Sequence, residues 1–158
     1  MRRVLLALVS LLALTASPAF AGPSPQTANF TVSANVMRGC RVSASPLNLG
    51  TYDPSSTVDL APAAGSTISV NCTKGTVFAI GPLTTTNTFR MANGPTELLD
   101  YALYQEVGHT TNWRTTGTGG TAASSNTAVT FGVYGVVTAG QDVAEGAYMD
   151  TVTVTVTF

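Results

Sequence analysis

Short segments along the chain alternate between apolar and polar residues, which is the pattern of β-strands that bury one face. The alternating segments are residues 30–36, 66–72, 76–83, 99–105, 129–137 and 148–158. Turn-forming residues, chiefly Gly, Pro, Asn and Asp, lie between them. Beyond residue 21 the chain is rich in Thr, Ser, Val, Ala and Gly, which favours strands and turns over helices. We therefore predict an all-β fold, a sandwich of short strands.

The last alternating segment continues to the final residue of the sequence. From Thr151 onward every second residue is threonine, and the residues between them are Val152, Val154, Val156 and Phe158. Such a segment is strongly disposed to pair as a strand, yet the sequence offers no later segment to cover it. A sandwich has to protect its edge strands, so this strand raises the question of what pairs with it.

The first alternating segment raises a related question. Phe30, Val32, Ala34 and Val36 fall on one face, after a lead-in that contains Pro, Ser and Gln. The segment either folds back as the ordinary first strand of its own domain or is offered to another molecule. The alternation alone does not separate these two interpretations.

Residues 1–21 have the features of a secretory signal peptide. Arg2 and Arg3 precede an apolar stretch of 11 residues, and an Ala-x-Ala cleavage site ends at Ala21. The apolar stretch is too short for the ~20 residues that a membrane-spanning helix needs. We therefore expect an exported chain that begins at Gly22 and has the length of one domain.

The balance of charges argues against two classes of partner. Without Arg2 and Arg3 the chain has five basic residues against eight acidic ones. Five cations do not make the basic surface that nucleic-acid binding requires, nor a cationic surface for membranes. We therefore expect no nucleic-acid or membrane-surface partner.

Cys40 and Cys72 are the two cysteines of the chain. In an exported protein the default expectation is a disulfide between them. Closing a loop of about 30 residues would stabilise the fold by roughly 3–4 kcal/mol in the chain-entropy treatment. The alternative is a metal or redox pair. Its support is weak, because the spacing is not C-x-x-C and His109 is the one histidine that could add a ligand.

The sequence gives little support to an enzyme, a metal site or a cofactor. His109 lies in a polar, turn-like stretch and is expected to be an exposed loop residue rather than a catalytic base. No G-x-S-x-G motif is present, and the carboxylates are scattered, mostly in turns. Residues 115–127, rich in Gly, Ser and Thr, are expected to form a mobile surface loop. We therefore predict no catalytic residues.

Several motifs, taken in order, resemble a known family. They are Cys40, LNLGTYD at 47–53, ISVNC at 68–72, FRM at 89–91, LLDYALYQ at 98–105, TTNW at 110–113 and GAYMDTVTVTVTF at 146–158. Each motif alone is weakly specific, but their order, spacing and terminal position resemble the spore coat protein U domain family. The members of this family are pilin-like subunits of archaic chaperone–usher pili. The resemblance covers almost the whole chain beyond the signal peptide.

The resemblance implies an incomplete immunoglobulin-like sandwich over residues 38–158, in which one strand is missing and an apolar groove is left. A periplasmic chaperone would lend the missing strand, and at an outer-membrane usher the N-terminal segment of another subunit would replace it. The donor segment is then 22–37. Its inserted side chains are Phe30, Val32, Ala34 and Val36. The acceptor groove is lined by the C-terminal strand, through Val152, Val154, Val156 and Phe158.

The resemblance thus implies a non-enzymatic exported subunit that polymerises with other copies, or with related subunits, into a surface fibre for adhesion and biofilm formation. A spore-coat or extracellular-matrix protein of the same fold is the second interpretation. A self-contained carbohydrate-binding domain is the third, with Tyr52, Tyr101, Tyr104 and Trp113 as a binding surface. We expect these aromatic residues to serve the core and corners of the sandwich instead. One departure from the family is the short lead-in, residues 22–29, before the donor alternation.

Overall fold

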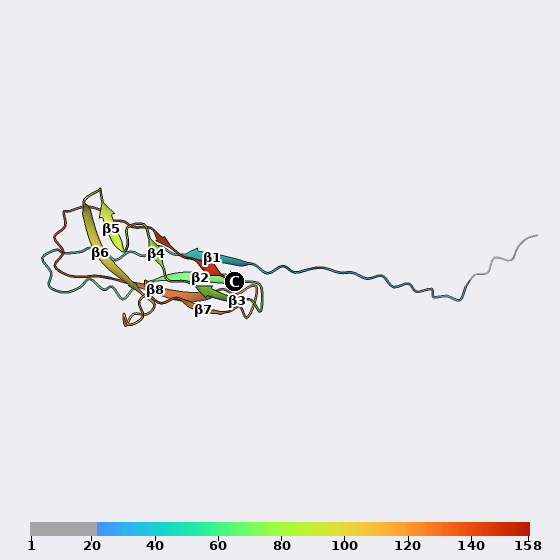
Figure 1. Ribbon diagram of the computed structural model, residues 1–158. Helices are drawn as coiled ribbons and strands as arrows, with labels where there is room; N and C mark the ends of the chain where they lie inside the picture. Colours follow the sequence, from blue (N-terminus) through green and yellow to red (C-terminus); the bar gives the residue numbers. More distant parts are fainter. Residues whose placement is uncertain (1–21) are drawn as a thin grey trace, which may run out of the picture. The chain divides into compact units, whose positions relative to one another are not determined.

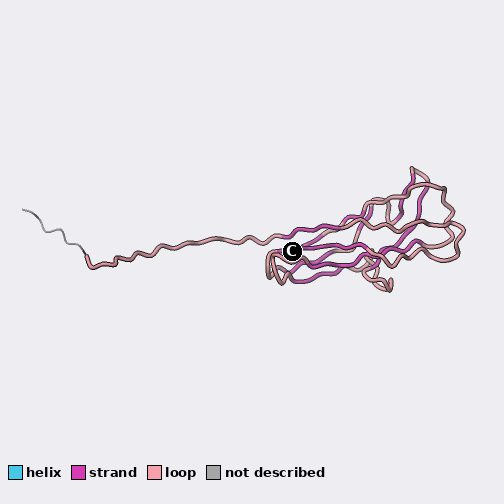
Figure 2. Tube along the Cα trace, turned by 180° about the vertical axis from the view of Figure 1, so that it is seen from behind, coloured by secondary structure: helices cyan, strands magenta, loops and turns pink. Residues whose placement is uncertain are grey.

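Strands make up the regular secondary structure of residues 22–158, the part of the chain that the computed structural model describes (Figures 1 and 2). The predicted signal peptide, residues 1–21, lies outside the described residues. Two units are distinguished, with the boundary between Asn35 and Val36. In residues 22–35 no strand is assigned, and their side chains are exposed. Because no helix is present among the described residues and all strand pairs are antiparallel, the predicted all-β class is confirmed.

Ten strands form in residues 36–158. They are β1 Cys40–Ala44, β2 Ser66–Cys72, β3 Val77–Ile80, β4 Thr84–Thr85, β5 Arg90–Asn93, β6 Glu97–Tyr104, β7 Thr118–Thr121, β8 Val129–Val137, β9 Val152–Thr153 and β10 Val156–Thr157. One layer is a five-stranded sheet in the order β1-β2-β8-β6-β5. The other contains the sheet β10-β3-β7 and the pair β4-β9. The chain thus forms a sandwich of the immunoglobulin-like type.

The core lies between the two layers because each strand turns its apolar positions inward. In β2, Ile68, Val70 and Cys72 are buried, as the alternation predicts. Phe78 of β3 and Phe131 of β8 meet edge to face across the layers, with ring centroids 6.1 Å apart. Such aromatic pairs stabilise a core beyond the apolar area that they bury.

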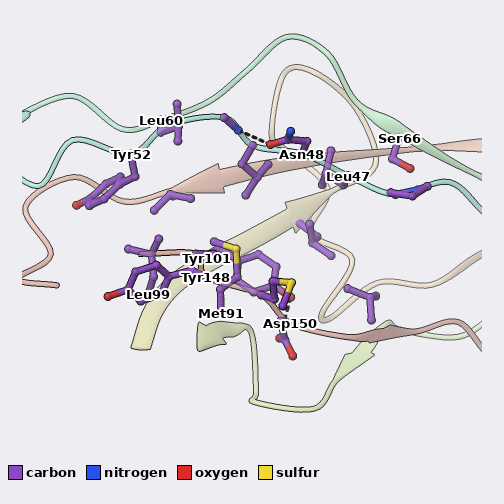
Figure 3. A pocket seen from close by; sticks show the side chains of 18 of the residues that line it. Leu47, Asn48, Tyr52, Leu60, Ser66, Met91, Leu99, Tyr101, Tyr148 and Asp150 are labelled. Carbon is purple, nitrogen blue, oxygen red and sulfur yellow. Dashed lines mark hydrogen bonds between the residues drawn. The ribbon is translucent and has the colours of Figure 1, made fainter. Parts of the chain in front are cut away.

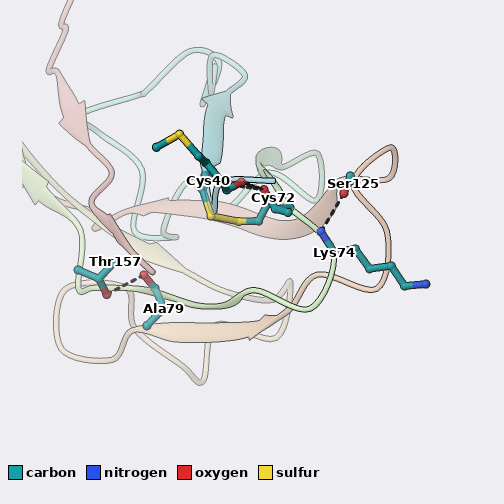
Figure 4. The surroundings of a disulfide bond; sticks show 9 residues. Cys40, Cys72, Lys74, Ala79, Ser125 and Thr157 are labelled. Atoms are coloured by element: carbon teal, nitrogen blue, oxygen red, sulfur yellow. Dashed lines mark hydrogen bonds between the residues drawn. A yellow bond between two sulfur atoms is a disulfide. The ribbon is translucent and has the colours of Figure 1, made fainter. Parts of the chain in front are cut away.

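The expected disulfide joins Cys40 and Cys72, which are directly opposite in the β1–β2 register (Figure 4). It therefore ties the first residue of β1 to the last residue of β2. Neither cysteine is free for a metal or redox pair.

The expectation of a mobile loop over residues 115–127 is wrong for part of that segment. Residues Thr118–Thr121 form β7, which pairs with β3. Its glycines permit this pairing. A Cβ on Gly119 would lie 2.5 Å from the carbonyl oxygen of Phe78, so a side chain there would collide with the neighbouring backbone. Low complexity here reflects close packing of two strands rather than mobility.

The C-terminal segment is one continuous alternation in the sequence but two short strands in the structure. β10 pairs with β3 through Val156 and Ile80, and β9 pairs with β4 through Thr153 and Thr84. The register shifts by one residue between the two pairs, at Gly81-Pro82-Leu83. Proline has no N–H to donate, so the ladder is interrupted there. We call residues 150–158 the C-terminal strand, since the two parts follow one path.

Candidate functional site

A groove of about 1100 Å³ opens between two parts of the chain that are distant in sequence. One side is the last residue of β1, Ala44, with the stretch that follows it to Tyr52, and the other is residues 143–152 with Val154. Figure 3 shows Leu47, Tyr52 and Leu60 on one side and Met91 and Asp150 on the other. The groove therefore lies along the edge of the sandwich, where β1 and the C-terminal strand border it.

The floor of the groove is apolar because it is the core itself. Its most deeply buried members come from β2, β6, β8 and the residue before β4. They are Ile68, Leu83, Leu99, Leu103, Val133 and Val137. An apolar groove of this volume that is accessible from the surface is typical of a binding site.

β1 borders the groove with an unpaired backbone edge. The Ser45 amide donates to Thr67 O at 3.0 Å, and the Thr73 amide donates to Gly39 O at 2.9 Å. In an antiparallel ladder successive residues direct their backbone groups to opposite sides. Every second residue of β1 therefore forms hydrogen bonds with β2. The residues between them, Val42 and Ala44, direct their N–H and C=O away from β2. No strand of the described chain pairs with this edge.

The C-terminal strand has an unpaired edge as well. The Gly81 amide donates to Thr155 O at 3.1 Å, and the Thr86 amide donates to Thr151 O at 3.1 Å. The threonines thus direct their backbone groups to β3 and β4, and the alternate residues direct theirs to the opposite side. These alternate residues are Val152, Val154 and Val156. Within residues 22–158 this second edge has no partner either.

The side chains of the C-terminal strand are only partly covered. Val154 and Val156 are half-buried against the core, whereas Val152 is 38% and Phe158 is 54% exposed. Val152 and Val154 line the groove, and Val156 and Phe158 lie beyond its lining residues. The strand's apolar face is therefore incompletely buried by the chain itself.

Comparison with known proteins identifies the family. The model of the Spore Coat Protein U domain matches residues 26–155. The chain belongs to the spore coat protein U domain family. A relative named "Protein U", from Myxococcus xanthus, is 35% identical over 161 residues, which covers 90% of this chain and 89% of that protein. The resemblance seen in the sequence motifs is thereby confirmed. Membership makes the chain an extracellular or surface structural protein of this family.

Hydrogen bonds hold together the loops at the end of this spore coat protein U domain that lies farthest from the disulfide. The Tyr52 hydroxyl donates to Thr138 O at 3.1 Å and accepts from the Gln141 amide at 2.8 Å. The Ala139 amide donates to Asp59 Oδ1 at 2.9 Å. Residues 52–59 and 138–141 are therefore held as one unit, which we call the loop end.

A partly buried hydrogen bond fixes the start of the C-terminal strand beside the groove. The Tyr101 hydroxyl donates to Asp150 Oδ2 at 2.9 Å, while Asp150 Oδ1 accepts from the amides of Thr151 and Asn87 at 2.8 and 3.3 Å. Burial, together with the Asp150 carboxylate, raises the pKa of Tyr101 far above its ordinary value. Tyr101 therefore remains a donor at every physiological pH.

A second anchor holds the loop that precedes the C-terminal strand. Glu97 Oε2 accepts from the Ala144 amide at 3.0 Å and from the Tyr148 hydroxyl at 3.4 Å. The single hydroxyl hydrogen of Tyr148 is shared with Ala144 O, the nearer acceptor at 2.8 Å. Desolvation and the Glu97 charge raise the pKa of Tyr148. The groove wall between residues 143 and 150 is thus held in place by carboxylates of β6 and of the strand itself.

The donor residues expected from the sequence are exposed. Phe30 is 86%, Val32 is 82% and Val36 is 80% exposed, and Ala34 is exposed as well. Residues 22–39 belong to no strand. Large apolar side chains at alternate positions are thus left uncovered.

His109 is not among the residues that line the groove. No group of three potential metal ligands occurs within residues 22–158. His109 is half-buried rather than exposed, because its ring packs against Tyr104 with centroids 5.2 Å apart. Nor does a helix in that range have the length and apolarity to cross a membrane.

Two of the aromatic residues considered for sugar binding are buried instead. Trp113 is 0% and Tyr101 is 9% exposed. The indole N–H of Trp113 donates to Gly132 O at 3.0 Å, as a core tryptophan requires. Tyr52 and Tyr104 are half-buried. The structure therefore places these residues in the core and corners of the sandwich.

The groove wall that follows β1 was not predicted from the sequence. Leu47 and Leu49 pack against Gly135 of β8, where a Cβ would lie 2.4 Å from a Leu49 methyl group. The alternation of Leu47 and Leu49 around Asn48, in a stretch that forms no strand, is the signal that could have identified it.

Proposed function

We propose that this protein is a subunit that assembles by strand exchange, with its groove receiving residues 30–36 of another copy. The single observation that supports the proposal is the open apolar groove between two unpaired backbone edges. An added strand would hydrogen-bond to the C-terminal strand and cover the apolar floor, which is the β-augmentation mode of recognition.

The donor segment has the chemistry that such a groove requires. Phe30, Val32 and Val36 would each contribute ~1.5–3 kcal/mol on burial, and Ala34 less, so the total is roughly 5–10 kcal/mol. Ordering the segment offsets part of this free energy. The segment 22–37 contains no charged residue, so no charge has to be desolvated on insertion.

The assembled product would be a surface fibre, a pilus that serves adhesion and biofilm formation. Until assembly, the groove would have to be covered, so a periplasmic chaperone and an outer-membrane usher are the partners that this mechanism calls for. Residues 1–21 would direct export. The second candidate is a spore-coat or extracellular-matrix structural protein of the same fold, which the name of the family favours.

The test is the assembly state of the full chain with signal peptide removed by the cell. Light scattering of the purified protein is expected to show oligomers that persist on dilution. Phe30→Asp with Val32→Asp should leave monomers, because carboxylates would enter an apolar groove. Val107→Asp is the matched control. Val107 is 55% exposed in a loop outside the groove, so its charge should change nothing.

A stable, reversibly unfolding monomer of the unmodified chain would contradict the proposal. So would equal oligomerisation of the wild type and the doubly charged variant. In either case the groove would have another occupant.

A further inference from the structure

We propose that two copies joined through the groove also meet at a charged junction, with Arg38, Arg41 and Lys74 of the incoming copy beside Asp53, Asp142 and Glu145 of the receiving copy. The inference rests on the proposed function and adds a second contact between the same two molecules. It follows from where charges lie on the sandwich, and from how short the connection between donor segment and β1 is.

Three of the cations lie together at the disulfide end of the sandwich. Arg38 and Lys74 line one shallow hollow, and Arg41 pairs in register with Asn71, next to the disulfide. Figure 4 shows Lys74 reaching away from the disulfide into open space. All three side chains are exposed. The ion pair found in residues 22–158 is Arg90 with Asp100, so these three cations have no acidic partner there.

The loop end carries most of the negative charge. Six of the eight acidic residues lie in the loop end, in the chain that directly follows it or in β6: Asp53, Asp59, Glu97, Asp100, Asp142 and Glu145. Three of these frame the mouth of the groove. Glu145 lines it, and Asp53 and Asp142 each adjoin lining residues. All three are exposed, and Asp142 and Glu145 have no hydrogen-bond or ion-pair partner for their side chains in the described chain.

The two charged surfaces lie at opposite ends of the same strands. β8 runs from Val129, near the end of β2 that carries Cys72, to Val137, which bridges to Leu60 at the loop end. Its nine residues span roughly 26 Å. Figure 1 shows this separation, with the start of β1 at one end and the loop between β5 and β6 at the other. Within one copy the two surfaces are therefore too far apart to pair.

The connection between donor and sandwich is short enough to bring the surfaces together between copies. Met37, Arg38 and Gly39 are the residues between Val36 and Cys40, the first residue of β1. Fully extended, they reach about 14 Å from Val36 to Cys40. Wherever Val36 lies in the receiving groove, the disulfide end of the incoming copy must therefore lie close to it.

The direction of insertion decides which charges meet. The C-terminal strand begins near the loop end, where Asp150 accepts from Tyr101, the residue opposite Val137. It runs towards the disulfide end, where Thr157 pairs with Ala79. A donor antiparallel to it would place Phe30 at the disulfide end and Val36 at the loop end of the receiving copy. Arg38 and Arg41 then face Asp53, Asp142 and Glu145. A parallel donor would place cations beside cations, so the charges favour the antiparallel direction.

The test is the rate at which the full chain assembles, followed by light scattering at 10 mM and at 500 mM salt. Arg38→Glu with Arg41→Glu should slow assembly about tenfold or more at low salt, because it replaces attraction by repulsion at the junction. The difference should largely disappear at high salt, where charges are screened over about 3–4 Å.

A charge-swapped chain makes the test specific. Adding Asp142→Arg and Glu145→Arg to the two arginine replacements restores opposite charges across the junction, with the net charge of the wild type. Its assembly rate should return to within about threefold of the wild-type rate. All four positions are exposed, so folding is expected to be unaffected, and circular dichroism would verify it.

Three results would overturn the junction. These are a wild-type rate for Arg38→Glu with Arg41→Glu at low salt, a faster rate for that variant, and no recovery in the charge-swapped chain. None of these results would contradict assembly by strand exchange, because the wild type would still form oligomers. If the wild type forms no oligomers, both proposals are wrong.

Discussion

Asp150 is the residue at which the groove wall becomes the C-terminal strand. Its two carboxylate oxygens accept hydrogen bonds from a side chain of β6 and from two backbone amides. Removing one donor from a partly buried carboxylate whose two oxygens both accept hydrogen bonds costs free energy of folding. The position of the strand edge therefore depends on a few polar contacts and not on apolar packing alone.

Tyr101→Phe removes the donor to Asp150 Oδ2 without changing the shape of the core. We expect it to lower the free energy of unfolding by roughly 1–3 kcal/mol, because a charged acceptor loses its partner. Tyr104→Phe is the matched control, since the Tyr104 hydroxyl makes no hydrogen bond within residues 22–158 and the residue is only half-buried. Urea unfolding of both variants measures the difference. Equal midpoints would show that the bond to Asp150 contributes nothing to stability.

Glu106 plays a similar local role in the loop after β6. Its Oε1 accepts from the Thr110 amide, the Thr110 hydroxyl and the Thr111 amide, at 2.7, 2.6 and 2.6 Å. These bonds, the one from the Thr110 hydroxyl first, lower the pKa of Glu106. They close a turn in which His109 has φ of 53°, a left-handed conformation that few non-glycine residues adopt.

The lowered pKa of Glu106 predicts how Glu106→Gln should depend on pH. A carboxyl whose pKa is lower in the folded state stabilises the fold above its ordinary pKa, and this contribution is lost as pH falls through the folded-state value. Wild type should therefore be the more stable protein at pH 7, and the difference should shrink below about pH 4.5. Thermal midpoints across this range measure it. A difference that is constant with pH would mean that the charge of Glu106 is irrelevant.

At the scale of strands, alternation predicted some elements well and missed others. β2 and β8 have the bounds of their alternating segments, because each buries one complete apolar face. β7 and the split of the C-terminal strand were not predicted. Both depend on partners: on the close approach of Gly119 to β3, and on Pro82 opposite the C-terminal strand. Such information lies in the neighbouring strand and not in the segment itself.

Gly119→Ala tests the close approach of β7 to β3. The new methyl group would meet Phe78 O at 2.5 Å, so we expect the free energy of unfolding to fall by ~1–3 kcal/mol. Gly120→Ala is the matched control, because its nearest neighbour would be the Phe78 ring at 3.5 Å, an ordinary contact. Denaturant unfolding compares the two. A loss in both variants would indicate a general cost of removing glycine from this strand.

At the scale of the whole molecule, the sequence predicted a C-terminal strand with an apolar face and a missing neighbour, but not the position of the groove. The alternation of the C-terminal strand identified an apolar face, and the resemblance identified a missing neighbour. The opposite wall, from Ser45 to Tyr52, was not predicted because it forms no strand and buries only alternate leucines. The separation of charges was also invisible, since residues far apart in the sequence meet at each end only after folding.

That separation has a consequence for the flanks of the sandwich. Apart from the charges assigned to the two ends, the described chain carries Arg90, which pairs with Asp100, and Glu106, Arg114 and Asp150. The Asp150 carboxylate accepts a hydrogen bond from the Tyr101 hydroxyl. The outward face of the C-terminal strand presents exposed threonines. Rods built from such units would have few charges along their sides, and hydroxyl groups along the C-terminal strand. Neighbouring rods would then repel one another only weakly, and could lie side by side in bundles even in dilute salt.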